Sequence, residues 1–157
     1  MNISVLKNPS NDIEEDYKAN LVRRLARNRF NQPAVLLSCA RSYRRLNPVN
    51  DITMANAFSQ GWTCQPLDKI FVPTVALCHV QGVIKKIYKD LSWSRLSETN
   101  ADTRWLSLRD KQRLLKGELW KFSGNEAPEY AHLLDLDLSE DLTQRGMANP
   151  VRYINCR

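Results

Sequence analysis

Apolar residues recur at helical spacing along most of this chain, and that spacing constrains its fold more than any other feature. The clearest case is near the N-terminus, where Ile13, Tyr17, Leu21 and Leu25 recur every fourth residue. Residues spaced in this way share one face of a helix, which is then expected to be buried. The 157 residues include only 5 glycines and 7 prolines, whereas sandwiches and barrels need many turn residues. The sequence therefore predicts an all-α fold, a compact bundle of five to seven helices.

The expected helices have recognisable ends. The first is expected over residues 10–30, with acidic residues at its start and arginines at its end, as the helix dipole favours. The second is expected over residues 31–48, where Pro33 fits the first turn and Pro48 follows the end. Further helical segments are expected over residues 50–61, 74–91, 107–122, 127–136 and 139–146. Glycine is unfavourable inside a helix, so Gly82 within the fourth helix suggests a close contact there.

Length and composition predict one domain. We expect it to span residues 1–157, with residues 1–10 as an N-terminal arm and residues 147–157 as an extended tail, each with room for a short strand. The N-terminus lacks a signal-peptide pattern, and no stretch approaches the ~18 apolar residues of a membrane span, so we expect a cytoplasmic protein. The four cysteines match no zinc or C-x-x-C spacing. Free thiols are therefore expected, with no metal and no cofactor.

The charge is distributed unevenly, and this asymmetry is the main functional signal. The net charge is +6, and residues 21–46 hold seven arginines and no acid, whereas residues 123–144 hold six acids and no lysine or arginine. Guanidinium groups bind phosphate through two parallel hydrogen bonds, so a bias toward arginine favours a phosphate-bearing partner. If the first two helices packed as a hairpin, the arginines would share one surface. The predicted phosphate-binding residues are Arg23, Arg24, Arg27, Arg29, Arg41, Arg44 and Arg45.

A second, weaker basic patch is expected on the polar face of the fourth helix. It comprises Lys85, Lys86 and Lys89. Lysines on the exposed side of an amphipathic helix are common, so this patch is weak evidence by itself. A simpler explanation of all the cations is a solvated face, with ion pairs to the acids of residues 126–141.

No catalytic constellation is evident. Asp135 and Asp137 could hold Mg²⁺, but no third ligand is apparent. His79 and His132 lie in no hydrolase or metalloprotease motif. Trp93 lies outside a clear apolar stripe and could stack on an unpaired base. A helix-turn-helix around residues 35–61 is a weak possibility, because its second helix has no lysine or arginine.

These observations favour a non-enzymatic nucleic-acid-binding protein, or a small helical subunit of a nucleoprotein complex. The alternative is a protein-binding inhibitor or adaptor of phage or plasmid type, whose basic face covers an acidic surface of a host protein complex. Neither hypothesis includes a small-molecule substrate or a membrane partner.

Overall fold

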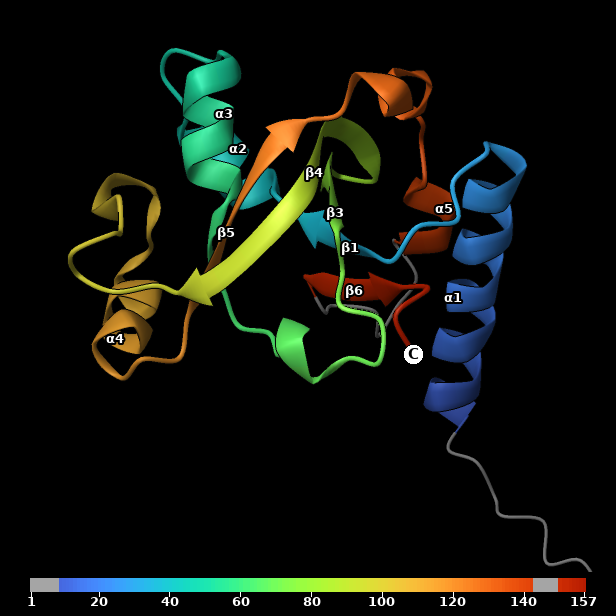
Figure 1. Cartoon of the computed structure of the whole chain (residues 1–157), viewed down its shortest axis with the longest axis horizontal. Coiled ribbons are helices and arrows are strands. Elements are labelled where there is room, and N and C mark those ends of the chain that lie inside the picture. Colours follow the sequence, from blue (N-terminus) through green and yellow to red (C-terminus); the bar gives the residue numbers. More distant parts are fainter. Residues whose placement is uncertain (1–8, 143–149) are drawn as a thin grey trace, which may run out of the picture.

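The computed structural model describes residues 9–142 and 150–157, and it shows a mixed α/β protein (Figure 1). Its six-stranded sheet consists of β1 (Ala34–Ser38), β2 (Gln60–Trp62), β3 (Val75–Val80), β4 (Val83–Arg95), β5 (Trp120–Glu126) and β6 (Val151–Ile154). The α-helices are α1 (Pro9–Arg27), α2 (Ala40–Arg45), α3 (Asp51–Phe58), α4 (Leu108–Leu115) and α5 (Ser139–Leu142). Three short 3₁₀ helices are η1 (Pro66–Asp68), η2 (Thr103–Trp105) and η3 (Pro128–Leu133). The predicted all-α bundle is therefore wrong.

The sheet has the strand order β2-β5-β4-β3-β1-β6. Strands β1 and β3 run parallel, and the other neighbouring pairs are antiparallel. The register shifts between Cys78 and His79 in the β3–β4 pair, and again between Lys89 and Ser92 in the β4–β5 pair. Such bulges bend a strand and increase its twist, which accounts for the curled shape of the sheet.

Helices cover both faces of the sheet, so the core has two layers. On one face, Leu21 and Leu25 of α1 pack with η3 and with the inward side chains of β1, β3 and β4. On the other face, Phe58 of α3 and Leu46 after α2 pack against Val35 and Leu37 of β1. A third small cluster joins α4 to the ends of β4 and β5. The central strands are thus buried on both sides.

This double burial explains why the second predicted helix is wrong. Residues 34–37 are all fully buried, because β1 lies between β3 and β6 with a helical layer on each face of the sheet. A parallel strand of this kind has a continuous apolar run without alternation. Periodicity alone does not distinguish such a run from part of a buried helix. The predicted helix over residues 31–48 is in fact β1 followed by the short helix α2.

The fourth predicted helix is a β-hairpin. Strands β3 and β4 pair in antiparallel fashion around a tight turn at Gln81 and Gly82, whose φ angles are 50° and 89°. Two consecutive positive φ angles match the type I′ turn that joins tight hairpins. A Cβ at Gly82 would lie 2.5 Å from the Cα of Ser139, so the expected close contact is present. Gly82 therefore marks a turn and not a helix interior.

Other expected elements have mixed outcomes. The first and third helices are confirmed as α1 and α3, and Asn50 caps α3 by accepting a hydrogen bond from the Thr53 amide at 2.9 Å. The fifth helix ends at Leu115, and β5 begins at Trp120. The strand expected in the tail is confirmed as β6, whereas residues 1–8 and 143–149 lie outside the described residues. Within the described ranges, no helix is long and apolar enough to cross a membrane.

Candidate anion-binding groove

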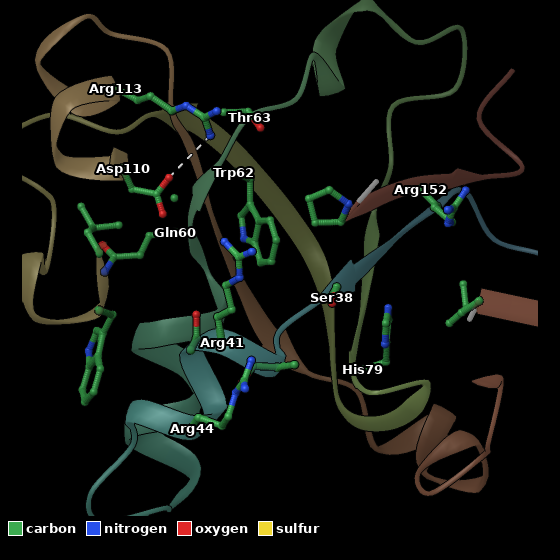
Figure 2. A pocket seen from close by; sticks show the side chains of 17 residues that line it. Ser38, Arg41, Arg44, Gln60, Trp62, Thr63, His79, Asp110, Arg113 and Arg152 are labelled. Carbon is green, nitrogen blue, oxygen red and sulfur yellow. Dashed lines mark hydrogen bonds and ion pairs between the residues drawn. The ribbon is translucent and has the colours of Figure 1, made fainter. Parts of the chain in front are cut away.

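A groove of about 500 Å³ opens where the parallel strands β1 and β3 end (Figure 2). One end of the groove is formed by α2, β2 and α4, and the other end by the last residues of β1 and β3 together with β6 and α5. The groove therefore passes across the carboxyl end of β1, from one face of the sheet to the other. In open α/β sheets, ligands commonly bind in a crevice outside the carboxyl ends of parallel strands. Its volume is in the range of small-ligand pockets.

Arginines from three elements dominate this groove. Arg41 and Arg44 come from α2, Arg113 from α4 and Arg152 from β6. Among the described residues that line the groove, Asp110 is the single carboxylate, and its oxygen lies 3.7 Å from an Arg113 nitrogen. Positive charge is therefore in excess. Figure 2 shows Arg41 and Arg44 extending from α2, with Arg113 on the opposite wall.

Arg41 and Arg44 are only weakly engaged by the protein itself. Within the described residues, Arg41 makes no ion pair and no side-chain hydrogen bond, and its side chain is exposed. Arg44 donates one long hydrogen bond, 3.4 Å, to the Ala40 carbonyl. Arg45, the next residue of α2, donates at 3.5 Å to the carbonyl of Trp105, which lines the groove. These guanidinium groups remain available to an anion.

His79 and Ser38 form the floor at the other end of the groove. They lie side by side in the parallel register of β1 and β3. His79 is only 8% exposed, and its Nδ1 accepts a hydrogen bond from the Gly82 amide at 3.0 Å. Burial, and secondly the charge of Arg152, lower the pKa of His79 to about 4. The ring is therefore neutral at pH 7 and carries its proton on Nε2, which has no hydrogen-bond partner among the described residues.

Tryptophans shape the groove wall without offering an exposed ring. Trp62 is buried and donates from Nε1 to the Phe58 carbonyl at 2.8 Å. Trp93, the predicted stacking residue, belongs to the core beyond the groove. Its Nε1 donates to the Pro73 carbonyl at 3.1 Å, and its ring meets Phe122 edge-on with centroids 5.4 Å apart. These contacts indicate a packing role for Trp93.

The seven predicted arginines do not share one surface. Arg23, Arg24 and Arg27 lie on α1, which covers the opposite face of the sheet from α2 (Figure 1). Arg24 forms an ion pair with Asp141 at 3.3 Å, and Arg23 donates to Asn20. Arg29 is exposed in the turn after α1. The predicted helical hairpin is absent because β1 intervenes, so only the α2 group reaches the groove.

The predicted lysine patch is engaged in ion pairs. Lys86 lies 2.6 Å from Asp51 and 2.8 Å from Glu126, and its side chain is only 14% exposed. Lys89 lies 2.8 Å from Glu129, and Lys85 lies 3.9 Å from Asp135. Acids of residues 126–141 therefore pair with these lysines and with Arg24 inside the chain. This is the explanation of the cations that needs no anionic partner.

The remaining candidates acquire structural partners. The Asp137 carboxylate accepts a hydrogen bond from the Ser139 amide at 2.8 Å, and no group of three metal-binding side chains occurs within residues 9–142 and 150–157. His132 Nε2 lies 2.7 Å from the Asn28 carbonyl. Cys39 lies between β1 and α2, but burial raises the pKa of its thiol well above the ordinary range, so it is a poor nucleophile. None of these groups faces the groove.

Two arginines of the groove, Arg113 and Arg152, carry no signal in the sequence. Arg113 lies in an ordinary charged helix, and Arg152 is a single cation in a short strand. Sequence patterns do not distinguish them from other surface cations, because they meet Arg41 and Arg44 only through tertiary contacts.

No family model matches the sequence, and no curated protein or solved structure is significantly similar to it. Function is therefore inferred from the chemistry of the groove.

Proposed function

We propose that this protein binds nucleic acid without acting as an enzyme, alone or as a small subunit of a nucleoprotein complex, and holds phosphates in the arginine groove. The observation that carries the proposal is the convergence of Arg41, Arg44, Arg113 and Arg152 on one groove, whose described lining residues include a single carboxylate.

Phosphate is the anion that best suits these groups. A guanidinium presents paired donors that match phosphate oxygens, and its charge persists at any physiological pH. The arginines come from both ends of the groove, so they are placed to contact successive phosphates of one strand. An extended strand also fits a groove of about 500 Å³ better than a duplex does, because it does not need a broad complementary surface.

The first test compares two double variants of equal charge change. Arg41→Ala with Arg113→Ala removes cations from the groove, whereas Arg27→Ala with Arg29→Ala removes exposed cations on and after α1. Binding of a short single-stranded oligonucleotide should weaken at least about tenfold in the groove variant. The log–log slope of affinity against salt should become shallower by about 0.7 for each phosphate that the variant no longer neutralises. The α1 variant should retain most of the affinity.

Two outcomes would count against the proposal. Equal weakening in both variants would show that only net charge matters. If the folded wild-type protein binds no oligonucleotide at low salt, the nucleic-acid function fails.

A second candidate function rests on a different surface. Leu67, Ile70 and Phe71 are 54%, 76% and 51% exposed in the segment between β2 and β3. Clustered apolar exposure of this kind is typical of protein contacts, so the adaptor hypothesis is kept. Affinity purification from native cells with and without nuclease separates the two functions. A protein partner that survives nuclease and no longer binds Ile70→Ser with Phe71→Ser would favour the adaptor.

A further inference from the structure

We propose that the end of the groove formed by Ser38, His79 and Arg152 is a phosphomonoester site, which recognises the terminal phosphate of a nucleic-acid strand. The inference rests on the proposed function and specifies which part of the ligand enters this end of the groove.

The sheet register brings the three side chains together. Ser38 pairs with His79 across the parallel strands, and Leu36 pairs with Arg152 across the antiparallel strands. Residues two apart on a strand point to the same face, so Ser38 lies on the same face as the Leu36–Arg152 pair. All three residues line the groove, and Figure 2 shows them in one part of it, away from Asp110 and Arg113.

Each of the three groups can donate a hydrogen bond to an anion. The Ser38 hydroxyl makes no hydrogen bond within the described residues, and the Arg152 guanidinium has only donors. For His79, the bond from the Gly82 amide to Nδ1 fixes the tautomer and leaves the Nε2 proton as a donor. Because His79 lines the groove, a ligand that enters the groove can place an acceptor at this position.

The number and kind of donors favour a terminal phosphate over an internal one. A phosphomonoester has three acceptor oxygens and nearly two negative charges at pH 7. An internal phosphodiester has two free oxygens and one charge. Three donors on three neighbouring strands, with no carboxylate among them, match the terminal group better. Arg41 and Arg113 would then hold the phosphates that follow along the strand.

The test measures a preference ratio. A short oligonucleotide labelled internally is prepared with a 5′-phosphate, with a 3′-phosphate, with hydroxyls at both ends and as a closed circle. The ratio is the dissociation constant of the hydroxyl form divided by that of a phosphorylated form. We expect one of the phosphorylated forms to bind at least about tenfold more tightly than the hydroxyl form. Hydrogen bonds to a charged group are strong, and a tenfold difference in affinity corresponds to only about 1.4 kcal/mol.

Three variants locate the preference. Ser38→Ala removes the hydroxyl, and His79→Asn keeps an oxygen that can accept from the Gly82 amide while it removes the Nε2 donor. Each should lower the ratio severalfold in protein that circular dichroism shows to be folded. The matched control, Arg113→Ala at the other end of the groove, should weaken all the oligonucleotides alike and leave the ratio unchanged.

The outcomes separate the two proposals. Tight, salt-sensitive binding with a ratio of one would overturn the phosphomonoester site and leave the nucleic-acid function standing. An unchanged ratio in both Ser38→Ala and His79→Asn would also overturn it. Direct binding of a nucleoside monophosphate, measured by calorimetry and abolished by Ser38→Ala, together with no oligonucleotide binding, would keep the phosphomonoester site, make a free nucleotide its source and end the nucleic-acid function.

Discussion

At the scale of single residues, the β3–β4 turn determines much of the groove. The Gly82 amide donates a hydrogen bond to His79 Nδ1 at 3.0 Å, and the Gly82 carbonyl accepts one from the Leu138 amide at 2.7 Å. The same residue has a φ of +89°, which L side chains rarely adopt. One glycine thus fixes the imidazole of the candidate site and the segment that leads into α5.

Gly82→Ala should destabilise the fold strongly. The new Cβ would meet the Ser139 backbone at 2.5–2.6 Å, in addition to the strain of the positive φ. We expect a decrease of about 3 kcal/mol in the free energy of unfolding, measured by denaturant titration. Gly117→Ala is the control, because Gly117 has a φ of +69° but nothing within 4 Å of a Cβ. It should cost only about 1 kcal/mol. Equal decreases in the two variants would contradict the close contact.

His79 should make the stability depend on pH. Burial, and secondly Arg152, lower its pKa from 6.5 to about 4 in the folded chain. At pH values between 4 and 6.5, His79 binds more protons in the unfolded chain than in the folded chain. The stabilisation that results from the lowered pKa is therefore complete above about pH 6.5 and is lost as the pH falls toward 4. The total decrease is on the order of 3 kcal/mol.

Unfolding measured at several pH values tests this expectation. His79→Asn should flatten the slope of stability against pH between about pH 5 and 6.5, where few carboxylates titrate. A slope equal to that of the wild type would show that His79 titrates normally. Direct titration of the His79 ring by NMR gives an independent check.

At the scale of elements, ion pairs connect β4 to the segments around it. Lys86 on β4 contacts Asp51 at the start of α3 and Glu126 at the end of β5. Lys89 contacts Glu129 on η3. These contacts attach the helical layers to the longest strand. The two lysines, which the sequence predicted to bind phosphate, are thus paired with carboxylates within the chain.

Lys86→Met should therefore affect stability and not binding. The free energy of unfolding should decrease by about 1 kcal/mol, because Asp51 and Glu126 are more than half exposed and stay solvated without their partner. Oligonucleotide affinity should remain close to that of the wild type. Lys116→Met, a change of an exposed lysine after α4, is the control and should alter neither quantity. A large decrease of affinity in Lys86→Met alone would restore the lysine patch as a binding surface.

At the scale of the whole molecule, the helical layers around the sheet protect the thiols. All four cysteines are free, and Cys39, Cys78 and Cys156 are at most 1% exposed. Cys64 is partly exposed, but burial raises the pKa of its thiol to about 11. Thiolate is the reactive form, so the folded protein should be almost inert toward thiol reagents at neutral pH.

A thiol titration without reductant tests this protection. In denaturant, all four thiols should react at once. In native buffer, Cys39, Cys78 and Cys156 should react only at the rate of global unfolding. An incomplete reaction in denaturant would indicate an oxidised pair, and rapid reaction of several thiols in native buffer would contradict the buried positions.

The sequence by itself determined the elements with strong local signals. Residues 10–30 carry a four-residue apolar repeat with dipole-matched ends, and they form most of α1 and the turn after it. Asn50 caps the start of α3, as such residues usually cap helices, whereas the helix ends at Phe58 and the expected stop, Gly61, lies in β2. The arginine bias of residues 41–45 also points to the part of α2 that borders the groove. In each case the signal lies within a few residues, where backbone preference and side-chain spacing act directly.

Only the tertiary structure decided the rest. The runs at residues 34–38 and 75–80 are strands because each is buried on both faces by segments far along the chain, and such burial removes the alternation that marks a strand. The groove also depends on contacts between segments far apart in the sequence. Arg41, Arg113 and Arg152 meet because β1 passes between α1 and α2 and because β6 returns beside β1. The sequence showed which charges this chain has, and long-range strand pairing decided which of them share a site and which pair with acids inside the fold.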